Sequence, residues 1–324
     1  MNVVNGMLKS FFENIFKMKV LLFLIAMFAA ASLFVPYFFT SLNLVNLLTS
    51  LCIYGIMAYG MTYVILAGEL DLSVGAVMAF SGVLLARLIP EIGTVAAIFV
   101  VLAVGIVIGA INGFLVSRLG LHSFVVTLSV MFFYNGLALS VAGGGPILTR
   151  DPLLNWLGNG STLSIPNQIW LAVILFFIAH YVLRKTRFGR NVYAVGGDQQ
   201  VARLTGIKVG FYKLGVFAIS SFCAAIGGVL LTGMQNSASP IAGSSAAFSI
   251  ITAVVIGGTS LTGGEGSLVR TVIGLLIFGI LDNSLSLLNV NPFHQTFYKG
   301  VLLVFVIAWD YYSRHKRAVQ TPGG

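Results

Sequence analysis

Two carboxylates lie two residues apart in the stretch GELDLSVG, residues 68–75, although the whole chain has only nine acidic residues. Paired carboxylates can act as a general acid and base or as ligands for a coupling ion. Here both flanking runs are apolar, and Asp71 is placed to accept a hydrogen bond from the amide of Ser73 or Val74 and so to cap the helix that follows. This structural role is our preferred interpretation, although it leaves Glu69 less explained. The residues assigned to the structural motif are Glu69, Asp71, Ser73 and Gly75.

No catalytic residue, metal site or cofactor of its own is expected in this chain. The glycine-rich stretch GGTSLTGGEGS, residues 257–267, lacks the lysine of a phosphate-binding loop. The four histidines are scattered, and the two cysteines lie within apolar runs. Asp282, next to Asn283, lies well inside an apolar run, where we favour a hydrogen bond between helices over ion coupling. Any ATP-driven function therefore requires a separate ATPase subunit.

The composition is that of a membrane protein. Charged residues make up 8% and hydrophobic residues 58% of the 324 residues, whereas a soluble domain has about 25% charged residues. Long apolar runs recur along the chain, and they are apolar on every face, which favours helices over a β-barrel. We predict an all-α polytopic membrane protein with about ten transmembrane helices. They are expected at 20–39, 44–67, 72–88, 93–117, 121–142, 168–183, 212–236, 246–262, 267–289 and 293–311.

Basic residues set the predicted orientation, because Lys and Arg near membrane segments are retained on the cytoplasmic side. With ten spans and an inner N-terminus, fifteen of the eighteen basic residues are cytoplasmic, the exceptions being Arg87, Arg150 and Lys299. Both termini are therefore predicted to be cytoplasmic, and Glu69 and Asp71 fall in a short inner turn that water can reach. The net charge of +9 is explained by insertion and by membrane lipid headgroups, so no nucleic-acid binding is expected.

The predicted spans form one transmembrane domain, residues 20–311, with shorter segments on either side of the membrane. Residues 1–19 have the apolar stripe of an amphipathic helix on the inner surface, and residues 312–324 form a cytoplasmic tail. The external loop 143–167 is predicted to contain a short helix or flap around the apolar residues Leu153, Leu154 and Trp156.

The longest inner segment, residues 184–213, carries seven basic residues. Asp198 is a suitable N-cap for a short helix DQQVARLTG that ends at Gly206. The residues themselves leave two interpretations about equal. Either the segment is a surface loop whose charges set the topology, or it presents a helix parallel to the membrane that contacts a soluble partner.

Polar residues inside the spans indicate a path for a neutral polar cargo such as a sugar, which hydroxyl and amide groups can bind. Such residues also form ordinary hydrogen bonds between membrane helices, worth ~0.6 kcal/mol on average, so most are expected to be structural. The glycines and alanines of GIVIGAINGF and AAIGGVLLTG indicate close helix packing. The candidates for the path are Tyr54, Tyr59, Thr62, Tyr63, Ser123, Thr127, Tyr134 and Asn135.

Three stretches resemble, in this order, segments of the ribose-type permeases of bacterial ATP-binding-cassette importers. GELDLSVGAVMAFSG resembles their GGIDLSVG segment, GRNVYAVGGDQQVARLTGI their cytoplasmic coupling segment, and AVVIGGTSLTGGEGS their second glycine-rich signature. The resemblance implies a permease subunit of the bacterial inner membrane that pairs with a second permease, usually an identical copy. It also implies two cytoplasmic ATPase domains, which bind ATP and Mg, and an external binding protein that delivers a monosaccharide.

The resemblance assigns roles to particular residues. Gln200-Val201-Ala202 followed by Gly206 matches the pattern by which importer permeases dock a short helix into an ATPase groove, with Arg203 helping to orient it. Two departures from the family pattern are Glu69 in place of a glycine and Ser249 in place of an aspartate, so Ser249 joins the path candidates and ribose is one candidate cargo. The implied coupling residues are Gly189, Arg190, Gly196, Gly197, Gln200, Ala202, Arg203 and Gly206.

The leading hypothesis is ATP-driven import of a ribose-like pentose or related sugar, with this chain as the passive membrane subunit. The alternatives are a branched-chain amino-acid importer of the same superfamily and a self-contained secondary carrier, against which the coupling segment argues. An inverted internal repeat is inferred from the family alone. The similar sequences GELDL and GEGSL, at 68–72 and 264–268, both fall on the predicted inner side, whereas an inverted repeat places equivalent loops on opposite faces.

Overall fold

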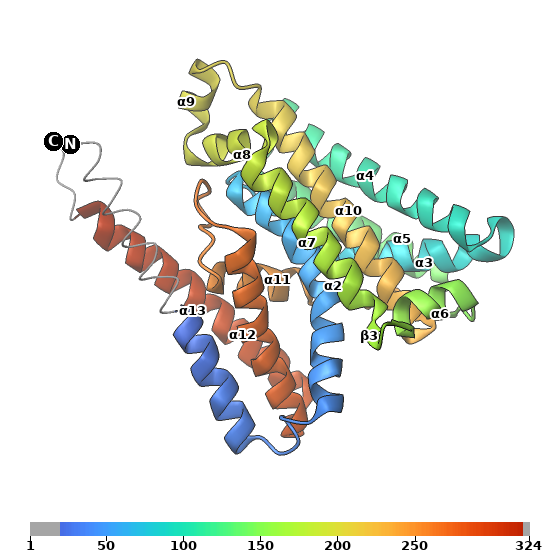
Figure 1. The fold of residues 1–324 in the computed structure, drawn as a ribbon. Coiled ribbons are helices and arrows are strands. Elements are labelled where there is room, and N and C mark those ends of the chain that lie inside the picture. The colour runs from blue at the N-terminus through green and yellow to red at the C-terminus, as the bar shows by residue number, and fades with distance from the viewer. Residues whose placement is uncertain (1–19, 320–324) are drawn as a thin grey trace.

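The computed structural model describes residues 20–319 and is built almost entirely of helices (Figure 1). The predicted amphipathic segment 1–19 and the last residues of the predicted tail lie outside the described part. The helices are Val20–Phe34, α2 (Ser41–Leu66), α3 (Val74–Ile92), α4 (Thr94–Arg118), α5 (Ser123–Ala142), α6 (Pro152–Asn159), α7 (Asn167–Lys185), α8 (Arg187–Gly197), α9 (Gln199–Leu204), α10 (Val209–Gln235), α11 (Ala246–Ile256), α12 (Leu268–Leu287) and α13 (Pro292–Val319).

Seven of the described helices are long and apolar enough to cross a membrane: α2, α3, α4, α5, α7, α10 and α12. Helices close every backbone hydrogen bond within one segment, which is the condition for entering hydrocarbon. The prediction of an all-α polytopic membrane protein is confirmed, whereas the number of ten spans stays a prediction. The last predicted span coincides with α13, which continues into the predicted tail as far as Val319.

Two of the predicted spans are wrong in length. The segment predicted at 20–39 is helical only over Val20–Phe34, because Pro36 disfavours helical backbone in the residue before it. The segment predicted at 246–262 forms the 11-residue helix α11. An 11-residue helix is about 16 Å long, and a bilayer core is about 30 Å thick, so α11 does not cross it alone. The helix ends before Gly257 and Gly258, and Gly258 adopts a φ of 87°.

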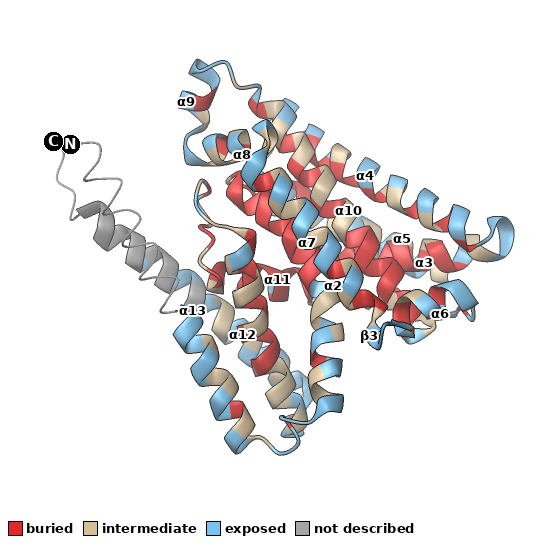
Figure 2. Cartoon of the chain, in the orientation of Figure 1, coloured by how far each residue is buried: buried red, intermediate tan, exposed pale blue. Residues whose placement is uncertain are grey.

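Helix α10 lies at the centre of the molecule, where it packs against α2, α3 and α4 (Figure 1). The glycines of α4 make the close approach possible. A methyl group on Gly109 would lie 2.7 Å from the Cα of Ala218, and one on Gly113 would lie 2.5 Å from the Cα of Leu214. The close helix packing predicted from these glycines is therefore confirmed, and it leaves α4 exposed on its other side (Figure 2).

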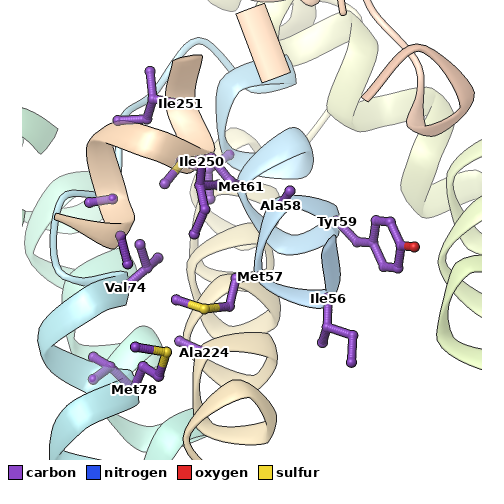
Figure 3. Close-up of a cluster of buried hydrophobic side chains, with 14 of the residues drawn as sticks. Ile56, Met57, Ala58, Tyr59, Met61, Val74, Met78, Ala224, Ile250 and Ile251 are labelled. Carbon is purple, nitrogen blue, oxygen red and sulfur yellow. The ribbon is translucent and has the colours of Figure 1, made fainter. Parts of the chain in front are cut away.

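The largest buried cluster fills the space between α2, α3, α10 and α11. Met57 of α2, Met78 of α3 and Ala224 of α10 lie together in it (Figure 3). Tyr59 points away from them, toward α7, where its ring centroid lies 5.7 Å from the ring centroid of Phe176. Burial is concentrated in these central helices, and α5 and α7 present more exposed faces (Figure 2).

The predicted external loop contains the helix α6, as expected. Asp151 caps it by accepting from the amide of Leu154 at 2.9 Å, and Pro152 occupies its first turn. Two short antiparallel pairs flank it: Ile147–Leu148 (β1) with Ser237–Ala238 (β4), and Ser161–Thr162 (β2) with Ile165–Pro166 (β3). The β1–β4 pair ties the loop to the end of α10, and the β2–β3 pair closes a turn within the loop.

A smaller cluster joins the helix Val20–Phe34 to the start of α2 and to α12. Asn43 of α2 and Asn283 of α12 exchange side-chain hydrogen bonds of 2.9 and 3.0 Å. The predicted hydrogen bond between helices at this site therefore exists, and it is made by Asn283. Its neighbour Asp282 instead pairs with Lys299 of α13, Nζ to Oδ1, at 2.6 Å.

Candidate functional site

Helices α8 and α9 stand together at one end of the bundle, beyond the ends of α2, α7 and α10 (Figure 1). Asp198 accepts from the amides of Gln200 at 2.8 Å and Val201 at 3.0 Å, so the predicted N-cap of α9 is confirmed. The helix ends at Leu204, and Gly206 turns the chain with a φ of 83°, a conformation that favours glycine.

One side of α9 is anchored and the other is open. Ala202 is buried in a small cluster with Val195 and Val209. On the open side, Val201 is 54% and Leu204 87% exposed. Val201 and Leu204 are three residues apart, so these two apolar side chains lie on the same face of the short helix. The predicted residues Arg190, Gln200 and Arg203 are also exposed on this end of the molecule.

A hollow of about 470 Å³ adjoins α9 where the chain turns back into α10. Tyr212 lies on its wall and accepts a hydrogen bond from the side-chain amide of Asn191 of α8 at 2.5 Å. This bond holds α8 to the first turn of α10, so the shape of the hollow follows from the position of α8. Its lining consists of Asn191, Thr205, Gly206, Ile207, Lys208, Phe211 and Tyr212.

The four glycines among the implied coupling residues divide into two groups. Gly189 packs against the backbone of Leu183, and Gly196 packs against the carbonyl of Leu66 at the end of α2. Gly197 and Gly206 have open space where a side chain would stand. Thus only Gly189 and Gly196 are required for close backbone contact, and both lie within α8.

Asp71 lies at the centre of a buried hydrogen-bond network. One carboxylate oxygen accepts from the amide of Ser73 at 3.0 Å and from its hydroxyl at 2.6 Å, and the other accepts from Ser220 of α10 at 2.8 Å. Asn112 of α4 donates to the Ser73 hydroxyl at 3.0 Å. The predicted hydrogen bond from the amide of Ser73 is therefore confirmed, whereas the predicted cap is not, because Ser73 is itself the N-cap residue of α3 and no side chain caps that helix.

The predicted solvation of the carboxylate pair is wrong, because Asp71 is completely buried and Glu69 nearly so. Burial raises the pKa of the Asp71 carboxyl, and the hydrogen bonds from Ser73 and Ser220 oppose that rise. Gly75, the last motif residue, packs against the backbone of Gly243.

Glu69, which sequence reasoning left unexplained, forms an ion pair with Lys213 in the first turns of α10. The side chains of Lys213 and Glu69 are 10% and 9% exposed. From the sequence, Lys213 is expected only to be one of the inner basic residues. A carboxylate is costly to bury without a cationic partner, so the position of Glu69 between two apolar runs was the sign that a basic residue such as Lys213 would pair with it.

The three notable stretches of the sequence meet at this same end. The amide of Gly264 donates to the carbonyl of Leu66 at 2.9 Å, and the hydroxyl of Tyr193 donates to the carbonyl of Gly266 at 2.8 Å. Gly196 of α8 lies against both partners of the first bond. The linker between α2 and α3, the loop between α11 and α12, and the segment α8–α9 are therefore in direct contact.

Comparison with known proteins adds the family. Residues 43–307 match the family described as branched-chain amino acid transport system / permease component. The chain belongs to this permease family. Apart from the first two residues of α2, the match covers the seven long apolar helices described above, the linker with Glu69 and Asp71, and the segment α8–α9.

The permease is also similar to named sugar permeases over most of its length. It is 37% identical over 297 residues to the ribose import permease of Escherichia coli, covering 90% of this chain and 92% of the relative. It is 39% identical over 299 residues to the ribose import permease of Haemophilus influenzae, covering 90% and 93%. It is 37% identical over 300 residues to the L-arabinose ABC transporter permease of Azospirillum brasilense, covering 92% and 88%. No solved structure matches the chain.

These relatives confirm the resemblance to ribose-type permeases that the three sequence stretches indicated. The permease is a transport component, and with seven helices able to cross a membrane within residues 20–319 it is a multi-pass protein of the bacterial inner membrane.

Four of the predicted path residues use their polar atoms inside the permease itself. Tyr63 donates to the carbonyl of Ala179 at 2.5 Å, and the hydroxyls of Thr62 and Thr271 lie 2.8 Å apart. Ser123 and Thr127 of α5 accept from the amides of Leu70 and Leu72, at 3.3 and 3.1 Å. These contacts hold α7, α12 and α5 to α2 and to the linker that follows it, which is the structural role expected for most of the set.

The other path candidates contact apolar rings or lie at different depths in the bundle. Tyr59 packs on Phe176, Tyr134 packs on Phe80 with their ring centroids 5.1 Å apart, and Ser249 is buried on α11. Tyr54 and Asn135 are partly exposed, on α2 and α5. The role of all these candidates in the cargo path stays a prediction.

Proposed function

We propose that this permease carries a monosaccharide, ribose or a related pentose, across the bacterial inner membrane in an ATP-driven importer. The observation that carries the proposal is the similarity of about 37–39% along about 90% of the chain to relatives named as ribose and L-arabinose permeases. That similarity extends over nearly the whole chain and is not confined to the three motifs.

The energy for transport comes, in this proposal, from two ATPase domains that bind ATP and Mg and dock on α9. The support is geometric. Val201 and Leu204 are exposed apolar residues at the end of the bundle, while Ala202 anchors the helix from behind. Arg190, Gln200 and Arg203 surround this apolar face and supply polar contacts at its rim. Gly206 ends the helix and opens the adjoining hollow to a partner side chain.

The remaining parts of the proposed assembly follow from the orientation of the permease in the membrane. Ten spans with both termini in the cytoplasm put α8 and α9 inside and α6 outside, where an external binding protein delivers the sugar. A second copy of the permease completes the path. The inverted internal repeat belongs to the same proposal. The loops after α2 and α11 are in contact, because the amide of Gly264 donates to the carbonyl of Leu66, so they are not the equivalent loops of such a repeat.

Reconstitution tests the cargo and the energy source together. The permease, its co-purified ATPase subunit and the binding protein are placed in proteoliposomes, and ATP-dependent uptake of labelled ribose, L-arabinose and leucine is compared. The proposal expects pentose uptake that requires ATP. Uptake of leucine alone supports an amino-acid permease instead, and uptake driven by an ion gradient without an ATPase subunit overturns the importer assignment.

A matched pair of leucines tests the docking surface. Leu204 on α9 is 87% exposed, and Leu163 in the turn between β2 and β3 is 82% exposed. Leu204→Glu places a charge at the centre of the proposed interface and is expected to lower recovery of the ATPase subunit about tenfold or more, since centrally buried apolar anchors contribute roughly 2 kcal/mol or more. Leu163→Glu is expected to leave recovery unchanged. Equal recovery in the two variants contradicts docking on α9.

A further inference from the structure

The Glu69–Lys213 pair joins two parts of the chain that the rest of the site also brings together. Lys213 follows the segment α8–α9 directly, near the start of α10. Glu69 lies in the linker between α2 and α3, two residues before the buried Asp71. The pair therefore spans the boundary between the surface that contacts a partner and the interior of the bundle.

The linker is held to α10 at two points. Lys213 contacts Glu69, and Ser220 donates to Asp71 at 2.8 Å. Positions 213 and 220 are about two helical turns apart and so lie on the same face of α10. A shift or tilt of α10 at its first turns consequently moves the linker, and the linker in turn carries the N-terminus of α3 through the hydrogen bonds of Asp71 to Ser73.

Stability alone is a weak reason for such a pair. Removing two charges from water costs several kcal/mol for each ion, and an apolar pair of similar size is often as stable. What two charges do supply is a contact that is lost when either side chain moves out of register. An apolar contact tolerates sliding, because it has no preferred direction.

We infer that Glu69 and Lys213 are positioning residues that transmit displacement of α9 to the linker between α2 and α3 when the ATPase subunit closes. This inference rests on the proposed function, since it requires an ATPase partner on α9. It goes beyond docking, because it names the contact through which docking reaches the transmembrane helices.

The neutral double variant Glu69→Gln with Lys213→Met separates transmission from folding, because it leaves no buried charge unpaired. Either single variant is expected to melt at lower temperature than the double variant, since it leaves one buried ion without its partner. The double variant is expected to retain its melting temperature and its ATPase subunit. Its ratio of ribose imported per ATP hydrolysed is expected to fall at least about fivefold, the lower end of typical coupling between two sites.

A second measurement does not depend on knowing the cargo. Hydrogen exchange of the peptide covering residues 67–73 is followed with and without the bound ATPase subunit and ATP. The parent permease is expected to show a change in protection on binding, and the double variant is expected to lose that change. The exchanged pair Glu69→Lys with Lys213→Glu is expected to restore it.

The outcomes distinguish the two proposals. A parent permease that recovers no ATPase subunit overturns the proposed function. A parent that binds the ATPase subunit and a double variant with an unchanged import ratio and exchange response overturn the transmission role alone. An unchanged peptide in the parent itself also overturns that role.

Discussion

Replacing Gly196 by alanine tests the contact on which the meeting of the three segments depends. Gly196 lies in α8, and a methyl group there would overlap the carbonyl of Leu66 and lie 2.7 Å from the amide nitrogen of Gly264. Those two groups form a hydrogen bond of 2.9 Å. The next residue, Gly197, is in the same helix and has open space around the equivalent position. Gly197→Ala is therefore a control of the same chemistry in the same element.

The expected magnitude follows from three contributions. Overpacking costs about 1–3 kcal/mol, and loss of the hydrogen bond between Gly264 and Leu66 costs about 0.5–1.5 kcal/mol. Alanine is favoured over glycine in a helix by about 0.8–1.0 kcal/mol. We expect Gly196→Ala to destabilise the permease by roughly 1–3 kcal/mol. Gly197→Ala is expected to be neutral or stabilising by up to about 1 kcal/mol.

The assay compares apparent melting temperatures of the purified permease in detergent, with ATP-driven uptake measured in parallel. Gly196→Ala is expected to melt about 3–10 °C lower than Gly197→Ala. It is also expected to import less ribose per ATP, because α8 must move away from the end of α2. Equal melting temperatures and equal import ratios in the two variants would refute the argument that backbone contact at Gly196 positions α8.

The other predictions concern the interior of the bundle. Gly109→Ala on α4 is expected to lower the melting temperature, because a methyl group would lie 2.7 Å from the Cα of Ala218. The control Gly136→Ala on α5 has open space for its methyl group and is expected to leave the melting temperature unchanged. Equal melting temperatures of the two variants contradict close packing of α4 on α10. Asp71→Ala removes the acceptor of three hydrogen bonds and is expected to destabilise by at least about 1–3 kcal/mol, since buried donors lose their partner. Unchanged denaturant resistance of that variant would show that the network around Ser220 is not needed for stability.

Much of the fold was predictable because membrane helices follow from local composition. Apolar runs mark helices wherever the bilayer leaves the backbone no other partner. The cap at Asp198 and the hydrogen bond from the amide of Ser73 to Asp71 follow from side chains that reach amides two or three residues away. The glycines of α4 likewise indicated a close neighbour, although they did not name α10 as that neighbour.

Two of the wrong predictions concern the segment that forms α11 and Asp71, and each has its own cause. The segment after Ala246 is apolar enough to be taken for a span, yet the backbone turn at Gly258 ends it as a short helix. Asp71 was assigned to solvent because short polar turns between spans usually face water. In the folded chain, Ser220, far along the sequence, supplies a hydrogen bond that a buried carboxylate needs.

The sequence by itself determined that this protein resides in a lipid bilayer, that it is built of α-helices, which family it resembles and where the cap of α9 lies. These properties depend on composition and on neighbours within a few residues. Only the tertiary structure decided that Glu69 pairs with Lys213 and that Gly196 lies against the end of α2. Those contacts join residues that are remote along the chain, and their energies depend on burial and distance, which exist only once the helices have packed.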